Sequence, residues 1–181
     1  MQHTIRQQDN LLAAAGFRGG STTTGRTQNV KTLQAVVGVA VDGIWGPLTS
    51  AAVTELSANG WRVAANFRLQ EFQCRCGGKY RDCQGIRVTP ALIVLVQTIR
   101  AKYYPKGLVL LSAYRCPGHN RAVGGASASQ HMYGTAADMT GRLTIAEAKA
   151  CGARGIGYGR HSARVNHVDT RAVPATFVDG L

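Results

Sequence analysis

The chain has 181 residues, of which 45% are hydrophobic, and it carries 21 Lys and Arg against 9 Asp and Glu, a net charge of +12. This length and apolar content fit one or two small folded domains and argue against a disordered chain. The positive charge favours anionic partners, but it is scattered without a basic run, which argues against a specific nucleic-acid groove. No stretch approaches the roughly 20 apolar residues of a membrane span.

The first 20 residues are predicted to be largely helical, and residues 19–25 are predicted to form a flexible polar joint. The apolar stretch 11–15 is too short for the core of a signal peptide. We therefore expect the protein to be made in the cytoplasm and to stay there at first.

Residues 27–56 are predicted to form a compact helical unit. Thr27 can cap a helix that runs to Val37, with its apolar residues on one face, and Gly38 closes it. Residues 41–47 form a tight loop with Asp-Gly turn chemistry, and Pro47 suits the start of a second helix that continues to residue 56.

After a junction at residues 57–65, helices and short strands are predicted side by side. A helix is expected over residues 89–102, and another begins at Thr144, where Glu147 completes a capping box. Strands are expected at residues 108–113, 155–158 and 165–170. This mixture predicts an α+β fold for the second part of the chain.

Three side chains form a candidate metal site. His131 and Asp138 lie seven positions apart with small residues between them, and His167 lies near the C-terminus. Two imidazoles and one carboxylate leave a fourth position for water, which is typical of a catalytic zinc site. Alternation along the predicted strand places Asp169 on the same face as His167.

The helical unit resembles the peptidoglycan-binding domain of many cell-wall hydrolases. The similarity rests on residues 30–34, on the Val-Asp-Gly-Ile-Trp-Gly-Pro-Leu-Thr segment 41–49, and on residues 52–53. It implies an all-α domain over residues 1–60 in which Asp42 and Trp45 contact peptidoglycan. The alternative is a generic two-helix hairpin in which Trp45 fills the core. The third helix of that domain is not obvious, so the unit is either shortened or uses residues 1–20.

The second part resembles the M15-type zinc D-Ala-D-Ala carboxypeptidases and L-alanyl-D-glutamate endopeptidases, which share a fold with the hedgehog signalling domain. Residues 129–138 match the pattern Ser-x-His-x-x-Gly-x-Ala-x-Asp, and residues 112–115 match the Ser-Gly-Tyr-Arg element with Ala113 replacing glycine. The resemblance implies a zinc peptidase domain over residues 66–181, with His131, Asp138 and His167 as Zn²⁺ ligands. Arg115 is the candidate to bind the oxyanion or a substrate carboxylate, and the alternative is a buried structural ion pair.

The general base departs from the family pattern. Many relatives carry Glu three residues before the last zinc ligand, but here that position is Arg164, which cannot accept a proton. We choose Asp169 as the base, and the alternative role for Asp169 is to orient a metal ligand. His161 is a further candidate.

The five cysteines allow two interpretations. Cys74, Cys76, Cys83 and Cys116 can be read as a second zinc site, although the Cys-x-Cys-x6-Cys spacing lacks the usual zinc knuckle, which disfavours this reading. The family resemblance implies that these cysteines lie close in space, where a disulfide can form in an oxidising compartment. Cys151, on a predicted helix, is expected to be a core residue.

Both resemblances concern peptidoglycan, and together they predict a monomeric phage endolysin that reaches the cell wall at host lysis. The predicted reaction is zinc-assisted hydrolysis of a stem-peptide amide, with the L-Ala–D-Glu bond ahead of D-Ala release. One alternative is a muramidase, which needs a suitable carboxylate pair. The other is a non-catalytic wall-binding module.

Overall fold

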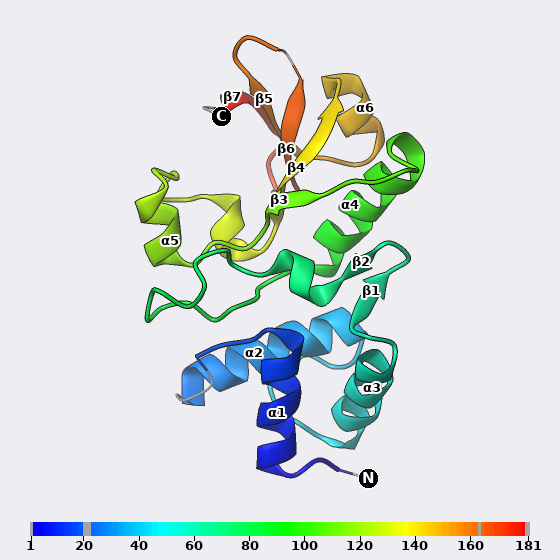
Figure 1. Cartoon of the computed structure of the whole chain (residues 1–181), viewed down its shortest axis with the longest axis vertical. Coiled ribbons are helices and arrows are strands. Elements are labelled where there is room, and N and C mark those ends of the chain that lie inside the picture. Colours follow the sequence, from blue (N-terminus) through cyan, green and yellow to red (C-terminus); the bar gives the residue numbers. More distant parts are fainter. Residues whose placement is uncertain (1, 20–22, 163, 180–181) are drawn as a thin grey trace.

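The computed structural model describes residues 2–19, 23–162 and 164–179 and places a helical unit beside a unit of helices and a sheet (Figure 1). The helical unit contains α1 (Ile5–Ala15), α2 (Thr23–Val37) and α3 (Pro47–Ala58). α1 begins with a capping box, in which the side chains of Thr4 and Gln7 each accept the other's backbone N–H, and it ends at Gly16. Within the described ranges, no helix is long and apolar enough to cross a membrane.

The helix boundaries differ from the prediction at the start of α2. This helix begins at Thr23 rather than after Thr27, so the predicted joint is helical over residues 23–25, and its residues 20–22 lie outside the described residues. Tertiary contacts explain the difference, because the buried Asn29 donates to the carbonyl of Arg18 at 2.8 Å and anchors this end of α2. α3 begins at Pro47, as predicted.

One buried amide organises the loop between α2 and α3. Gln34 Nε2 donates to Asp42 Oδ1 at 2.8 Å and to the carbonyl of Ile44 at 2.9 Å. Trp45 is buried, and its Nε1 donates to Ser50 Oγ at 2.9 Å. This burial favours the core role of Trp45 over contact with peptidoglycan, whereas Asp42 is exposed and remains a predicted contact.

The second unit is built on a five-stranded sheet with the strand order β3-β4-β6-β5-β7. The strands are β3 (Leu110–Ser112), β4 (Ala136–Leu143), β5 (Gly155–Gly159), β6 (Val165–Asp169) and β7 (Ala175–Asp179). Neighbouring strands are antiparallel except for β5 and β7, which are parallel. β7 was not predicted, because its short edge segment carries no strong hydrophobic pattern.

Helices flank this sheet on two sides. In Figure 1, α4 (Pro90–Tyr103) and α6 (Ile145–Ala150) lie on one side, and α5 (Pro117–Ala122) lies on the other. The predicted capping box of Thr144 with Glu147 is confirmed, and α4 begins at Pro90, where the side chain of Thr89 caps the helix by accepting from the N–H of Leu92. The α+β arrangement of this unit is therefore confirmed.

The helical unit and the sheet unit share one hydrophobic core. The cluster runs from Leu33 in α2 through Trp61 and Phe67 to Val168 in β6. A short hairpin of β1 (Arg62–Ala64) and β2 (Phe67–Arg68) connects the two units. The predicted division into residues 1–60 and 66–181 stays a prediction, but its two parts pack directly against each other.

Gly85 lies at this junction, and a substitution there tests how far packing between the two units contributes to stability. Its φ is +80°, and a Cβ there would overlap the carbonyl oxygen of Gly16. We expect Gly85→Ala to lower the free energy of unfolding by about 2 kcal/mol or more, as measured by urea denaturation. Gly107→Ala is the control, because nothing lies within 4 Å of a Cβ there. Equal stability of the two variants would contradict this packing.

Candidate active site

Strand pairing places two of the three predicted ligand residues opposite each other. Asp138 in β4 pairs directly with His167 in β6, so both side chains project from the same face of the sheet. On the other side of β6, Gly157 pairs with His167 and Gly155 pairs with Asp169. A Cβ at Gly155 would overlap the Asp169 carboxylate, so the glycine leaves the space that this carboxylate occupies.

The third ligand residue comes from the short 3-10 helix η2 (Gln130–Tyr133), which precedes β4. His131 is buried in this helix, and the helix ends at Gly134 with φ +70°. A Cβ at Gly134 would overlap the backbone of Arg87, so glycine is needed both for the left-handed turn and for this close approach. The backbone N–H of Thr89 donates to the Gly134 carbonyl at 3.0 Å and ties η2 to the start of α4.

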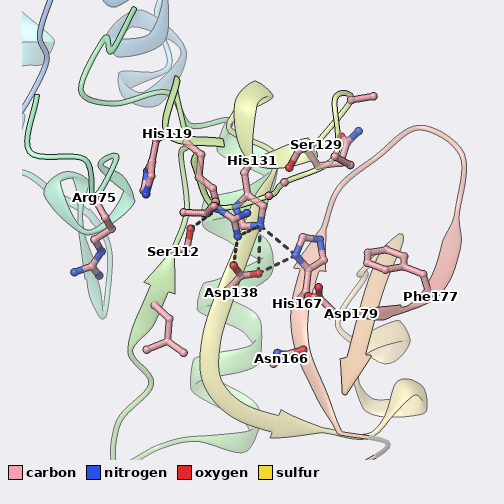
Figure 2. Close-up of a pocket in the computed structure, with 18 of the residues that line it drawn as sticks. Arg75, Ser112, His119, Ser129, His131, Asp138, Asn166, His167, Phe177 and Asp179 are labelled. Carbon is pink, nitrogen blue, oxygen red and sulfur yellow. Dashed lines mark hydrogen bonds and ion pairs between the residues drawn. The ribbon is translucent and has the colours of Figure 1, made fainter. Parts of the chain in front are cut away.

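The inward-facing atoms of the three residues converge on one point, as Figure 2 shows. His131 Nε2 lies 3.2 Å from Asp138 Oδ1, and His167 Nδ1 lies 2.9 Å from the same oxygen. The two imidazole nitrogens are 3.2 Å apart. The structure therefore brings together the three residues that the sequence predicted as metal ligands.

The outer nitrogens of both imidazoles are held by acceptors, and this orients the inner ones. His131 Nδ1 donates to the carbonyl of Ala113 at 2.6 Å, and His167 Nε2 donates to Asp169 Oδ2 at 3.2 Å. The inner nitrogen of each ring therefore faces Asp138, where it can donate a proton to the carboxylate or, once deprotonated, bind a metal ion through its lone pair. Two imidazole nitrogens and one carboxylate oxygen are a donor set that suits zinc, with each ligand oriented from behind.

The electrostatics of the site favour a bound cation. Burial alone would raise the pKa of Asp138, but hydrogen bonds from His131 and His167 outweigh it and hold that pKa well below its usual range. Burial alone would lower the pKa of His167, but hydrogen bonds to Asp138 and Asp169 raise it to about 9. Two carboxylates thus create a negative environment that attracts either a proton or a metal ion to His167.

Arg115 lies against the same cluster. Its guanidinium forms an ion pair with Asp138 Oδ2, and its Nη2 lies 3.1 Å from His131 Nε2. Its Nε donates to Ser112 Oγ at 2.9 Å, which fixes the plane of the guanidinium. Arg115 therefore lies beside the candidate metal ligands, as its predicted role in binding the oxyanion or a substrate carboxylate requires. It also forms the buried ion pair that was the alternative prediction.

Asp169 lies behind His167 rather than in front of the ligand cluster. Its carboxylate is fully buried, and Arg171 Nε donates to its two oxygens at 2.9 and 3.0 Å. Hydrogen bonds from His167 and Arg171 outweigh the effect of burial and hold the pKa of Asp169 well below its usual range. This position fits the role of orienting His167, which was the alternative to general base.

A cleft of about 830 Å³ opens over the ligand cluster. Besides His131, Asp138 and His167, its lining includes Arg75, Ser112, Arg115, His119, Ser129, Asn166, Arg171, Phe177 and Asp179. One wall is the loop after α5, which Asn120 holds by donating to the carbonyls of Gly125 and Ala126 at 3.2 and 2.9 Å. His161 and Arg164 are exposed, and neither lines the cleft.

Sequence reasoning missed several residues of the cleft. Arg171 follows Asp169 by two positions, and its charge near the predicted site was a usable signal. Phe177 and Asp179 come from β7, which has no motif, and only the parallel pairing of β7 with β5 brings them to the site.

The model of the family described as Peptidase M15 matches residues 65–169, more than half of the chain. The chain belongs to the Peptidase M15 family. This M15 peptidase is 32% identical over 115 residues to the zinc D-Ala-D-Ala carboxypeptidase of Streptomyces albus G, an alignment that covers 61% of this chain and 44% of that enzyme. The chain thus spans less than half the length of this relative. Family and donor set together identify a zinc metallopeptidase.

Replacing Asp169 tests its orienting role in this M15 peptidase. We expect Asp169→Asn to weaken zinc binding at the hydrolytic site about tenfold to a hundredfold, because the amide no longer draws the Nε2 proton of His167 towards it. The measurement is the recovery of activity of metal-free protein at buffered concentrations of free zinc. Activity should return when zinc is in excess. A variant with normal zinc dependence and no turnover would instead identify Asp169 as the general base.

Proposed function

We propose that this M15 peptidase is a peptidoglycan hydrolase that cleaves an amide bond of the stem peptide. The observation that carries the proposal is the convergence of His131, Asp138 and His167 at the floor of an open cleft, with the outer nitrogen of each imidazole held from behind. Zinc, when bound by these residues, would supply a Lewis acid and would lower the pKa of water at the site to about 7.

Cationic side chains in the cleft support an acidic peptide as substrate. Arg75, Arg115 and Arg171 all contribute to its lining. Stem peptides carry free carboxylates, and a guanidinium binds a carboxylate with two parallel hydrogen bonds. Arg115 lies nearest the ligand cluster, so we assign it to the oxyanion that develops from the scissile carbonyl or to a carboxylate beside it.

The cleft favours cleavage within a peptide over removal of a terminal residue. Figure 2 shows Arg75, Ser112 and His119 on one side of the ligand cluster and Phe177 on the other. A peptide bound along this cleft extends in both directions from the reacting carbonyl. We therefore propose L-alanyl-D-glutamate endopeptidase activity. D-Ala-D-Ala carboxypeptidase activity is the second candidate, because it is the activity in the name of the similar Streptomyces enzyme.

The helical unit supports a role in holding the cell wall. The loop between α2 and α3 exposes the side chains of Val41, Asp42 and Ile44, and the first turn of α3 exposes Leu48. A wall-binding unit attached to a peptidase raises the effective concentration of an insoluble substrate, and the net charge of +12 attracts anionic envelope polymers. We propose that the protein acts as a monomeric phage endolysin, made in the host cytoplasm and released to the wall at lysis.

The two alternative functions receive less support. A muramidase needs two carboxylates that flank a glycosidic bond, but among the described residues lining the cleft the acids are Asp138 and Asp179, and Asp138 is bound by two histidines and Arg115. A non-catalytic wall-binding module does not require an open three-ligand centre with oriented imidazoles.

Digestion of purified sacculi tests the proposed reaction. We expect the protein to release stem peptides from intact glycan chains, with new termini at L-Ala and D-Glu identified by mass spectrometry. A chelator should abolish release and added zinc should restore it.

His131→Ala is the matched control, since it should still bind sacculi without releasing peptides. Release of D-Ala alone would establish the carboxypeptidase instead. Release of sugar fragments that resists the chelator would contradict the peptidase, and binding without any release would point to the non-catalytic module.

The attacking water must lose a proton to a side chain in the cleft. We infer that Asp179 takes the proton from the attacking water. Asp179 lines the cleft near His167. Among the described residues, the cleft has two acids, and the other one, Asp138, is a candidate metal ligand. Asp179→Asn should lower kcat about a hundredfold or more while zinc affinity stays unchanged. Glu55→Gln, an exposed change on α3, is the control. Normal turnover in Asp179→Asn would exclude this role.

A further inference from the structure

Four cysteines gather in a second cluster, away from the hydrolytic site. Cys74, Cys76 and Cys83 come from the loop before α4, and Cys116 caps the start of α5. Their sulfur atoms all lie within 4.8 Å of one another, with Cys76 Sγ 3.3 Å from Cys83 Sγ and 4.0 Å from Cys116 Sγ. All of the cysteines are free.

We propose that these four cysteines bind a structural zinc ion, in addition to the zinc of the hydrolytic site. Four thiolates at Zn–S distances of about 2.3 Å form a tetrahedron whose sulfur atoms are about 3.8 Å apart. The observed spacings of 3.3 and 4.0 Å bracket that value. Cys76 is close to two other sulfur atoms rather than to one, as a single central ion requires and as two separate disulfide pairs do not.

The surroundings of the cluster suit thiolates. Cys74, Cys83 and Cys116 are buried, so four protein ligands would close the site against water. The backbone N–H of Cys116 donates to Cys74 Sγ at 3.4 Å, and that of His119 donates to Cys116 Sγ at 3.4 Å. Hydrogen bonds of this kind stabilise charged sulfur and orient it towards a metal.

Charge balance is also favourable. Zinc binding to four thiols releases four protons and leaves a centre with a net charge of −2. The loop between Cys74 and Cys83 carries Arg75, Lys79 and Arg81 against Asp82, an excess of positive charge beside the centre. The segment that supplies three of the four ligands therefore carries cations that can offset the charge of the thiolates.

The location of the cluster explains what the ion would stabilise. Residues 73–89 contain no helix or strand, and their one bridge joins Gln73 to Ile86. A segment of this length without secondary structure is uncommon in a compact domain, and a metal centre would cross-link it. Cys116 directly follows Arg115, so the ion would also anchor the segment that carries this arginine into the cleft.

The spacing in the sequence did not favour this site, because Cys-x-Cys-x6-Cys contains no zinc knuckle. Only the fold shows that Cys116, 33 positions after Cys83 in the sequence, lies against the other three. Cys151 lies outside the cluster and is half-buried in the turn after α6.

Counting metal and thiols on the full chain tests the proposal. We expect two zinc ions per chain by elemental analysis, and alkylation of the unreduced, denatured protein should modify all five cysteines. Cys76→Ser should retain one zinc ion and full occupancy of the hydrolytic site, whereas His167→Ala should retain only the cysteine-bound ion. Cys151→Ser is the matched control and should retain two.

Cobalt substitution gives a readout on the wild-type chain that does not depend on any variant folding. Four-thiolate coordination should produce intense sulfur-to-cobalt charge-transfer absorption, and this absorption should persist in His167→Ala. One zinc ion per chain with no such absorption would overturn the proposal. Alkylation of only one cysteine, which reveals two disulfides among the other four, would overturn it as well.

Discussion

The pairing of β4 with β6 is the constraint on which the active site depends. It places Asp138 opposite His167, and it places Asp169 one step along the same face, where the carboxylate reaches the outer nitrogen of His167. A shift of β6 by one residue in this register would turn His167 and Asp169 to the face of the sheet opposite Asp138. The zinc centre of this peptidase is therefore a property of one strand pair, completed by His131 from the helix that precedes β4.

Glycines around this strand pair leave space for the ionisable side chains of the site and for the backbone that carries them. Gly155 leaves space for the Asp169 carboxylate, and Gly134 lets the segment carrying His131 pass close to the backbone of Arg87. The buried charges are then satisfied in pairs, Asp138 by Arg115 and Asp169 by Arg171. Buried charges are tolerated only with such partners, so the residues that orient the ligands also make their burial possible.

The irregular parts of the chain are held by polar or sulfur clusters rather than by regular elements. Gln34 organises the loop of the helical unit, Asn120 holds the loop that forms one wall of the cleft, and the four cysteines gather the long segment before α4. Each cluster ties a segment outside the helices and strands to a defined point of the fold. The cleft is thus bounded on one side by the sheet and on the other by loops with defined anchors.

Local chemistry and spacing determined much of this protein from the sequence alone. The cap at Thr144, the start of α3 at Pro47 and the three candidate ligand residues are all readable there, because each depends on neighbours within a few positions or on a dense motif. The position of Asp169 behind His167, the burial of Trp45 and the gathering of the cysteines were decided by tertiary structure. Each of these depends on which distant segment lies beside the residue, and a one-dimensional pattern does not contain that information.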